Sequence, residues 1–77
     1  MATKIFLSHK EHVQSVPASE WLIAHNFGRL PIVDVFVQLP GWDTPRKVIP
    51  EEVIAVDPNN VKITFAGNSV AGLAVLR

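Results

Sequence analysis

The segment Ser19–Val37, SEWLIAHNFGRLPIVDVFV, decides the fold that the sequence predicts. Apolar side chains alternate with other residues on both sides of its central HNFG run, a pattern typical of β-strands. Asparagine and glycine are common in turns, and Gly28 can supply a positive φ at this point. The segment therefore predicts two short strands, over residues 20–25 and 32–39, joined by a tight corner.

Proline, glycine and asparagine interrupt the rest of the chain at short intervals, with β-branched and aromatic runs between them. Short strands with regular turn signals predict an all-β fold, a small antiparallel β-sandwich (Ig-like or jelly-roll-like) of about six to eight short strands. The clearest hairpin is VDPNNVKITF, in which Asn59 and Asn60 tolerate left-handed backbone. The expected strands are Lys4–Ser8, Glu20–His25, Ile32–Leu39, Arg46–Ile49, Glu52–Val56, Val61–Phe65 and Gly72–Leu76.

The segment Ser8–Pro17 fits a connector, a short extra strand or an extended arm. Residues 1–17 are therefore assigned to an N-terminal strand and connector or arm, and residues 18–77 to the β-sandwich domain. The start of the chain, MATKIFLSHKEH, lacks a long apolar stretch, so we expect neither a signal peptide nor a membrane anchor.

Composition limits the kinds of partner. The 77 residues include no cysteine, which excludes disulfides and thiolate metal sites. Seven Lys plus Arg balance seven Asp plus Glu without a basic cluster, so we expect no nucleic-acid partner and no membrane insertion. A domain of this size buries only about 60% of the surface of its unfolded chain. With 48% apolar residues, association with other chains is the expected route to further stability.

Alternation along the strands assigns their faces. One face of each of three strands supplies a plausible core: residues 21, 23 and 25, residues 33, 35 and 37, and residues 61, 63 and 65. The opposite faces are also apolar, although a solvated face should be polar. They predict burial against another subunit, and the expected contact residues are Leu22, Ile32, Phe36, Trp42, Leu73 and Val75.

The pattern W-x-I-x-H-N-F-G-R-x-P-x-V-x-V, then V-x-I-T-F and A-G-L-A-V-L, resembles a small β-sandwich module of bacteriophage tail-fibre, baseplate and other virion proteins. The resemblance covers roughly Glu20–Leu76. The chain departs from the family at Phe27, where Leu is usual, at Ala71, where Ser is usual, and at Leu73, where a charge is common. The resemblance implies a homo-oligomer, in particular a trimer, that binds other virion proteins. It also implies a virion location after synthesis in the host cytoplasm.

The corner residues His25, Asn26 and Gly28 are predicted to be structural, with imidazole and amide satisfying loop backbone groups. The alternative is a histidine general base or a ligand contact, but no nucleophile or acid–base partner stands at a matching spacing. No catalytic residue, no cofactor and no enzymatic activity are therefore expected.

Two acidic or histidine-containing runs are predicted to lie in solvent. His9 and His12 would point to opposite faces of a strand, so no metal site is expected within one chain, although three copies around a threefold axis could bind an ion. Glu51 and Glu52 would diverge on a strand, so we expect a solvated edge there and no shared catalytic site.

The run PGWDTPRK leaves two alternatives open. Trp42, Asp43 and Arg46 could form a platform for a sugar, or Trp42 could be buried at a subunit contact. The leading prediction is a bacteriophage structural protein of the tail, baseplate or fibre that acts by protein–protein assembly. The alternatives are a carbohydrate-binding module that recognises host-surface glycan and a capsid decoration or collar protein.

Overall fold

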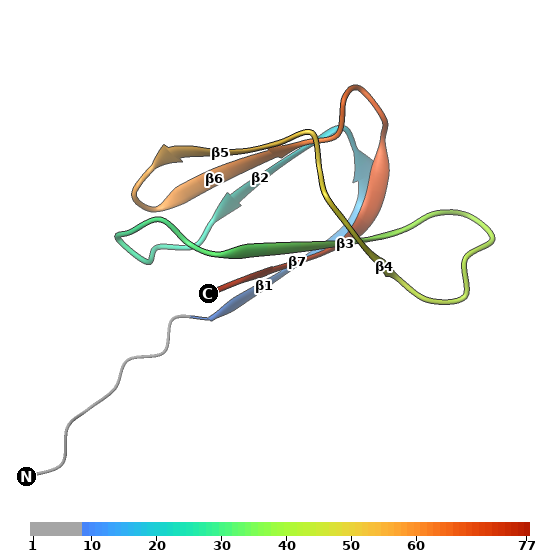
Figure 1. The fold of residues 1–77 in the computed structure, drawn as a ribbon, viewed down its shortest axis with the longest axis horizontal. Helices are drawn as coiled ribbons and strands as arrows, with labels where there is room; N and C mark the ends of the chain where they lie inside the picture. The colour runs from blue at the N-terminus through green and yellow to red at the C-terminus, as the bar shows by residue number, and fades with distance from the viewer. Residues whose placement is uncertain (1–8) are drawn as a thin grey trace, which may run out of the picture.

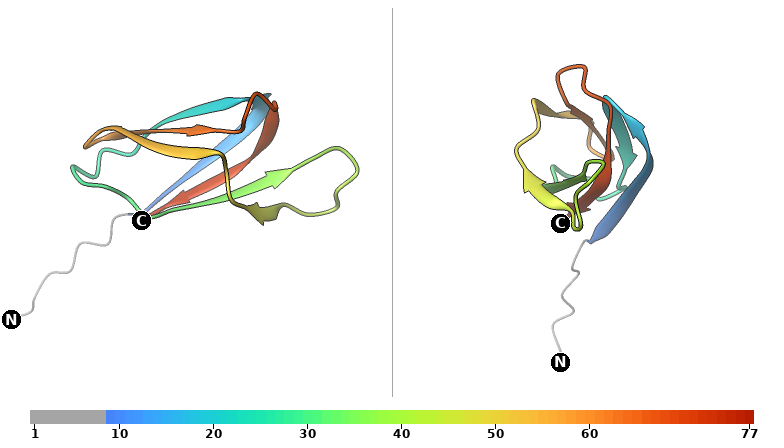
Figure 2. Two further views of the ribbon diagram at one scale, coloured as in Figure 1. Left: turned by 45° about the horizontal axis from the view of Figure 1, so that its top comes forward. Right: turned by 90° about the vertical axis from the view of Figure 1, so that its right-hand side faces the viewer.

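The computed structural model describes residues 9–77, which form seven strands and no helix. The strands are arranged in two antiparallel sheets, one of four strands in the order β1-β7-β3-β4 and one of three strands in the order β2-β6-β5 (Figure 1). Figure 2 shows the sheets as two layers that face each other, with β1 running into β2 where the layers meet. The predicted all-β sandwich is confirmed. The strands are β1 (Lys10–Ala18), β2 (Glu20–Ala24), β3 (Val33–Gln38), β4 (Arg46–Val48), β5 (Glu52–Asp57), β6 (Asn60–Thr64) and β7 (Val70–Leu76).

The core lies between the two sheets and follows the alternation of the strands. Its centre is Trp21 on β2, which is fully buried and lies against the ring of Phe65 at a centroid distance of 4.7 Å. The indole Nε1 donates a hydrogen bond to the carbonyl oxygen of Val70, 3.2 Å away, so that its buried N–H is satisfied. The predicted inner residues are buried, with Val33 half-buried at the rim. The buried apolar residues are Trp21, Ile23, Val35, Val37, Val61, Ile63, Phe65, Ala74 and Leu76.

The segment that fitted a connector, a strand or an arm forms strand β1. Its register with β7 runs from Lys10 opposite Leu76 to Gln14 opposite Gly72, and an irregularity follows before Ala18. Strand β1 therefore belongs to the four-stranded sheet and crosses the expected boundary between residues 17 and 18. The expected strand Lys4–Ser8 lies outside the described residues.

Strands β3 and β7 approach each other closely at Gly72. A Cβ atom at this position would overlap the carbonyl oxygen of Phe36 and lie 2.8 Å from the Cα of Val37. Gly72 has no positive φ, so the need for glycine here is steric and not conformational. The close approach lets β7 sit between β1 and β3 in the middle of the sheet.

The hairpin between β5 and β6 forms as predicted but by another mechanism. Neither Asn59 nor Asn60 has a positive φ, so the expected left-handed backbone is wrong. Instead, the carboxylate of Asp57 accepts hydrogen bonds from the backbone N–H of Asn59 (2.8 Å) and from the side-chain amide of Asn60 (2.9 Å). These bonds, the one from the Asn59 backbone above all, hold the pKa of Asp57 below its ordinary value.

Candidate assembly surface

An apolar row crosses the outer face of the four-stranded sheet. The register places Val13 of β1 opposite Leu73 of β7, Leu73 opposite Phe36 of β3, and Phe36 opposite Lys47 of β4. Successive side chains on a strand point to opposite faces, and the neighbouring Val35 and Ala74 are buried in the core. The row Val13–Leu73–Phe36–Lys47 therefore points away from the core on all strands of this sheet.

A second row runs beside the first. Val75 of β7 stands between Glu11 of β1 and Asp34 of β3. Beyond the end of β3, Ile32 and Arg77 exchange two backbone hydrogen bonds of 2.7 and 2.9 Å, which continue the ladder by one pair. We use the name "outer face" for this surface of the four-stranded sheet, and its residues are Glu11, Val13, Ile32, Asp34, Phe36, Lys47, Leu73, Val75 and Arg77.

The apolar residues of the outer face retain much of their exposure. Val13 is 70% exposed and Ile32 is 64% exposed, whereas Phe36, Leu73 and Val75 are half-buried by their neighbours. An antiparallel sheet whose second face meets water is normally polar on that face. The outer face is thus an apolar surface that the other residues between 9 and 77 leave uncovered.

A cluster of three charges lies at one side of this face. Asp34 accepts from the Lys47 ammonium at 3.2 Å and from the Arg77 guanidinium at 2.9 Å. The hydrogen bond from Lys47 is the largest cause that holds the pKa of Asp34 below its ordinary value. One carboxylate with two cations leaves an excess positive charge at this place.

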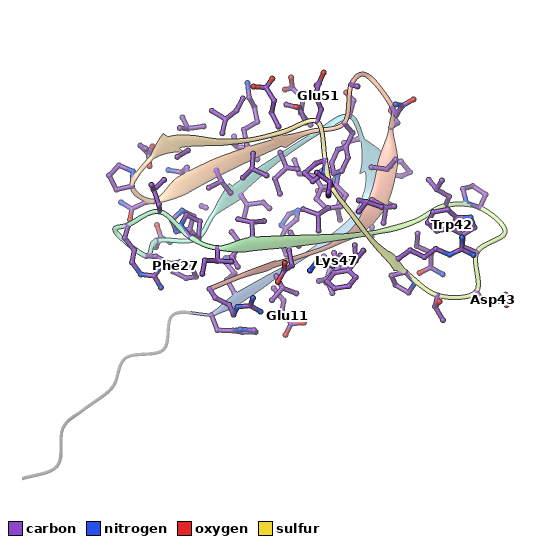
Figure 3. All side chains as sticks on the ribbon, viewed as in Figure 1. Glu11, Phe27, Trp42, Asp43, Lys47 and Glu51 are labelled. Atoms are coloured by element: carbon purple, nitrogen blue, oxygen red, sulfur yellow. The ribbon has the colours of Figure 1, made fainter. Side chains whose placement is uncertain are left out.

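The opposite charge stands at the other edge of the sheet. Glu11 on β1 is exposed, and its Oε2 lies 3.4 Å from Nε2 of His9. Figure 3 shows Glu11 and Lys47 on the same lower side of the molecule, away from Glu51. The outer face therefore carries a negative edge on β1 and a positive edge on β4.

The structure brings together most of the predicted contact residues but not all of them. Ile32, Phe36, Leu73 and Val75 share the outer face. Leu22 instead lies on the outward side of the three-stranded sheet, beside Lys62, and is 67% exposed. The sequence prediction missed Val13, because β1 lacks the regular apolar alternation that marks the face of a strand.

Trp42 lies apart from both sheets' outer surfaces, in the loop between β3 and β4. It is half-buried against the core, its backbone oxygen accepts from Nε2 of Gln38 (3.1 Å), and the Arg46 guanidinium lies 4.2 Å from its ring centroid. Asp43 is exposed in the same loop, which projects beyond the ends of the sheets (Figure 3). The predicted sugar-platform residues are neighbours, but Arg46 already lies over the indole ring.

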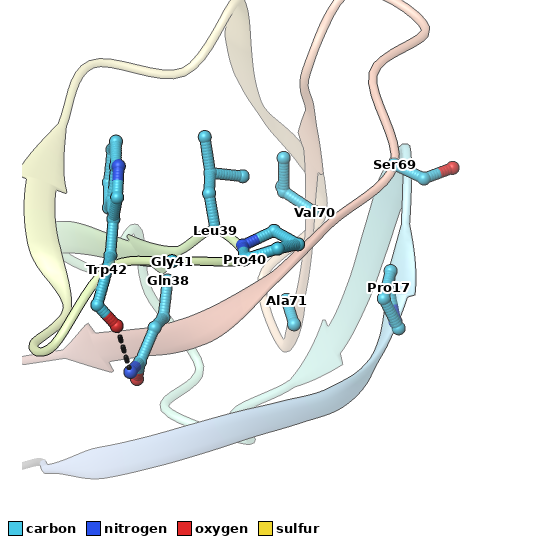
Figure 4. Close-up of a pocket in the computed structure, with 9 residues that line it drawn as sticks. All are labelled: Pro17, Gln38, Leu39, Pro40, Gly41, Trp42, Ser69, Val70 and Ala71. Carbon is cyan, nitrogen blue, oxygen red and sulfur yellow. Dashed lines mark hydrogen bonds between the residues drawn. The ribbon is translucent and has the colours of Figure 1, made fainter.

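A cavity of about 470 Å³ opens beside this loop. In Figure 4, Trp42 stands on one side and Ser69 and Pro17 on the other. Its polar groups are the Gln38 amide and the Ser69 hydroxyl, and most of the remaining lining is apolar. The lining residues are Pro17, Gln38, Leu39, Pro40, Gly41, Trp42, Ser69, Val70 and Ala71.

The predicted corner residues make hydrogen bonds with loop backbone and with the β5–β6 turn. The backbone N–H of Phe27 donates to Nδ1 of His25 at 3.0 Å, so the proton of a neutral imidazole is on Nε2. This buried Nε2 has no hydrogen-bond partner among the described residues. Gly28 has the expected positive φ of 70°, and its N–H donates to the side chain of Asn59 at 2.9 Å.

Asn26 contributes to the corner differently from the prediction. It adopts a positive φ of 60°, and its backbone N–H donates to the carbonyl oxygen of Asn59 at 3.1 Å. The side-chain amide that satisfies loop backbone is that of Asn59, 31 positions away from Gly28. Sequence spacing could not reveal this pairing, because the corner and the β5–β6 turn meet only in the folded sandwich.

Side chains of the histidine and glutamate runs make hydrogen bonds with nearby residues. His12 lies on β1 beside Trp21, with its Nε2 2.7 Å from Oε1 of Gln14. Glu51 accepts from the Thr64 hydroxyl (3.0 Å) and the Ala66 backbone (3.1 Å), which fixes the loop before β5. Within residues 9–77, no group of three or more His, Cys, Asp or Glu side chains could hold a metal ion.

Comparison with known proteins gives no relative for this chain: no family model, no curated protein and no solved structure matches it. In the described part of the chain, no helix is long and apolar enough to cross a membrane. What the fold and surface define is a small β-sandwich with an apolar, charge-polarised outer face.

Proposed function

We propose that this chain is a structural protein of a bacteriophage virion that acts by protein–protein assembly. It forms a homo-oligomer, a trimer on the family resemblance, and binds a larger part of the particle such as a tail, baseplate or fibre. The observation that carries the proposal is the apolar row Val13–Leu73–Phe36 on the outer face. Covering such a row removes apolar surface from water, which favours association by about 25 cal/mol per Å².

The size of the outer face limits the expected affinity. Four strands at about 4.8 Å spacing and about six residues of 3.3 Å rise give a flat area of roughly 400 Å². Standard interfaces bury roughly 800 Å² of accessible surface per partner. We therefore expect association in the micromolar range, strengthened where a second surface also makes contact.

The first experiment compares two matched valine variants by sedimentation equilibrium at micromolar concentration. Val13→Gln changes the outer face, whereas Val56→Gln changes an exposed valine on β5 of the other sheet without altering the charge. We expect Val13→Gln to weaken self-association by about fivefold, equivalent to about 1 kcal/mol of lost burial. Val56→Gln is expected to associate like the wild type. A monomeric wild-type chain under these conditions would refute the proposal.

The virion location needs a separate test. Purified phage particles from an infected culture that encodes the chain are analysed by mass spectrometry and by immunogold labelling. The chain should be present at a fixed stoichiometry and at one place on the particle. Its absence from washed particles would show that it is not a virion component. The place of labelling distinguishes a tail, baseplate or fibre part from a capsid decoration or collar protein.

The cavity beside Trp42 favours one alternative function, the recognition of host-surface glycan. Its volume of about 470 Å³ lies in the range of small-molecule sites, and an aromatic ring with a nearby amide suits a sugar. Arg46 on the indole ring counts against a simple stacking platform. A glycan array with the wild type and Trp42→Ala tests the alternative. Binding that is lost in the variant while the oligomer persists would support glycan recognition.

A further inference from the structure

We propose that the partner of the outer face is a second copy of this chain, held so that Glu11 on β1 of one copy pairs with Lys47 on β4 of the other. This inference rests on the proposed function, because it assumes that the chain self-associates through the outer face. It adds the relative placement of the two copies and the residues that determine it.

The first observation is the opposite charge of the two edge strands. Within the strands, β1 presents Glu11 on the outer face and β4 presents Lys47. The apolar residues Val13, Leu73 and Phe36 lie between them. A contact that places β1 of one copy at β4 of another therefore buries the apolar row and joins unlike charges. A contact of β1 with β1 would join Glu11 with Glu11, which like-charge repulsion disfavours.

Lys47 has the capacity to make this second contact. The Asp34 carboxylate pairs with Arg77 at 2.9 Å as well as with Lys47 at 3.2 Å. It therefore remains paired with Arg77 when the Lys47 ammonium turns to a carboxylate of another copy. The Lys47 side chain is 65% exposed, and an ammonium group has three donors. Glu11 presents an exposed carboxylate on the outer face, which can accept from the Lys47 ammonium of another copy.

The backbone edges favour a contact through side chains. Strand β4 has only three residues and lies between Pro45 and Pro50. Strand β1 is irregular between Gln14 and Ala18, where Pro17 lacks an N–H group. Short, proline-flanked or bulged edges resist the addition of another strand. On the four-stranded sheet, the outer face and not an edge is therefore the surface available to a second copy.

Complementary edges suit two arrangements, and both contain the Glu11–Lys47 contact. Two copies can stack face to face with β1 of each over β4 of the other. Alternatively, each copy can meet the next head to tail and close a ring, since a heterologous contact closes where the rotation allows it. The mass of the oligomer distinguishes a pair from a ring, and the charge test below applies to both.

The experiment is a charge-reversal cycle measured by sedimentation equilibrium on the full chain. Glu11→Lys and Lys47→Glu are made singly and together, and each single reversal is expected to weaken self-association about tenfold. The double variant should recover most of the wild-type affinity. Raising the salt from about 0.1 M to 0.5 M should weaken the wild type, because exposed pairs are screened.

Two controls separate this inference from effects on folding. Glu52→Lys reverses an exposed carboxylate on β5, an edge strand of the other sheet, and should leave association unchanged. Lys47→Met removes the charge without placing a second carboxylate beside Asp34, and it should weaken association in a chain whose thermal unfolding stays cooperative. Two results would overturn the inference and leave the proposed function standing. One is single variants that associate like the wild type, and the other is a double variant that does not recover the wild-type affinity. A wild-type chain that remains monomeric would overturn both.

Discussion

Replacing Gly72 by alanine tests the close approach of β3 and β7 in the middle of the four-stranded sheet. The new Cβ would overlap the Phe36 carbonyl oxygen and lie 2.8 Å from the Cα of Val37, where carbon atoms normally stay about 3.5–4.0 Å apart. Strand β3 would have to move by at least about 0.7 Å to relieve this overlap. The atoms that the new Cβ meets belong to the backbone of β3 and cannot rotate aside as a side chain could.

The expected loss of stability is about 3 kcal/mol. Overpacking a well-packed interior costs about 1–3 kcal/mol, and the rigid backbone puts this site at the upper end. A chain of 77 residues has a free energy of unfolding of about 4–12 kcal/mol. Gly72→Ala should therefore lower Tm by about 12–24 °C, at roughly 4–8 °C per kcal/mol for a domain of this size.

The assay is thermal and urea unfolding followed by far-UV circular dichroism at one fixed protein concentration. Gly41→Ala is the matched control, since nothing lies within 4 Å of its Cβ position and only its φ of 89° is unfavourable for alanine. We expect that control to lose only about 1–2 kcal/mol. If Gly72→Ala were as stable as Gly41→Ala or more stable, the described packing of β7 against β3 would be refuted.

Three further substitutions probe the ion cluster, the core and the corner. Asp34→Asn should destabilise the chain at neutral pH, and its difference in stability from the wild type should disappear on acidification. The pKa of Asp34 in the folded chain lies below its ordinary value of 3.8, so the carboxylate stabilises the fold above pH 3.8 and loses this effect as the pH falls through its folded-state pKa. Urea midpoints measured across the acid range test this expectation. Trp21→Phe should cost about 2–3 kcal/mol because it leaves a void and an unpaired carbonyl at Val70, and an unchanged Tm would contradict this. His25→Leu should be less stable than His25→Asn by about 1 kcal/mol, since Asn can still accept from the Phe27 N–H; the reverse order in urea unfolding would count against the structural corner.

The sandwich could be predicted because its central strands obey a local rule. Trp21 and Ile23 alternate with exposed residues, and Val61 and Ile63 alternate with half-buried polar residues, so a period of two marks the buried face. Strand β1 does not obey the rule. Its inward positions are Lys10, His12 and Gln14, polar residues at the rim of the sandwich, and their pattern does not distinguish an edge strand from a connector.

The candidate surface could be predicted only in part, because it depends on register as well as alternation. The apolar character of Phe36 and Leu73 was visible in the sequence, but their position beside Val13 and Lys47 is set by pairing between distant strands. Leu22 has the same apolar character and lies on the other sheet. Alternation identifies which residues point outward, whereas only the topology determines which of them share a surface.

The position of β7 has a consequence for biosynthesis. This strand follows all the others in the chain, yet it separates β1 from β3 and hydrogen-bonds to both. The ribosome must therefore release β7 before the four-stranded sheet can form, whereas β2, β5 and β6 can pair earlier. Until then, a nascent chain exposes the inward side of its first hairpins to chaperones, proteases and neighbouring polysomes.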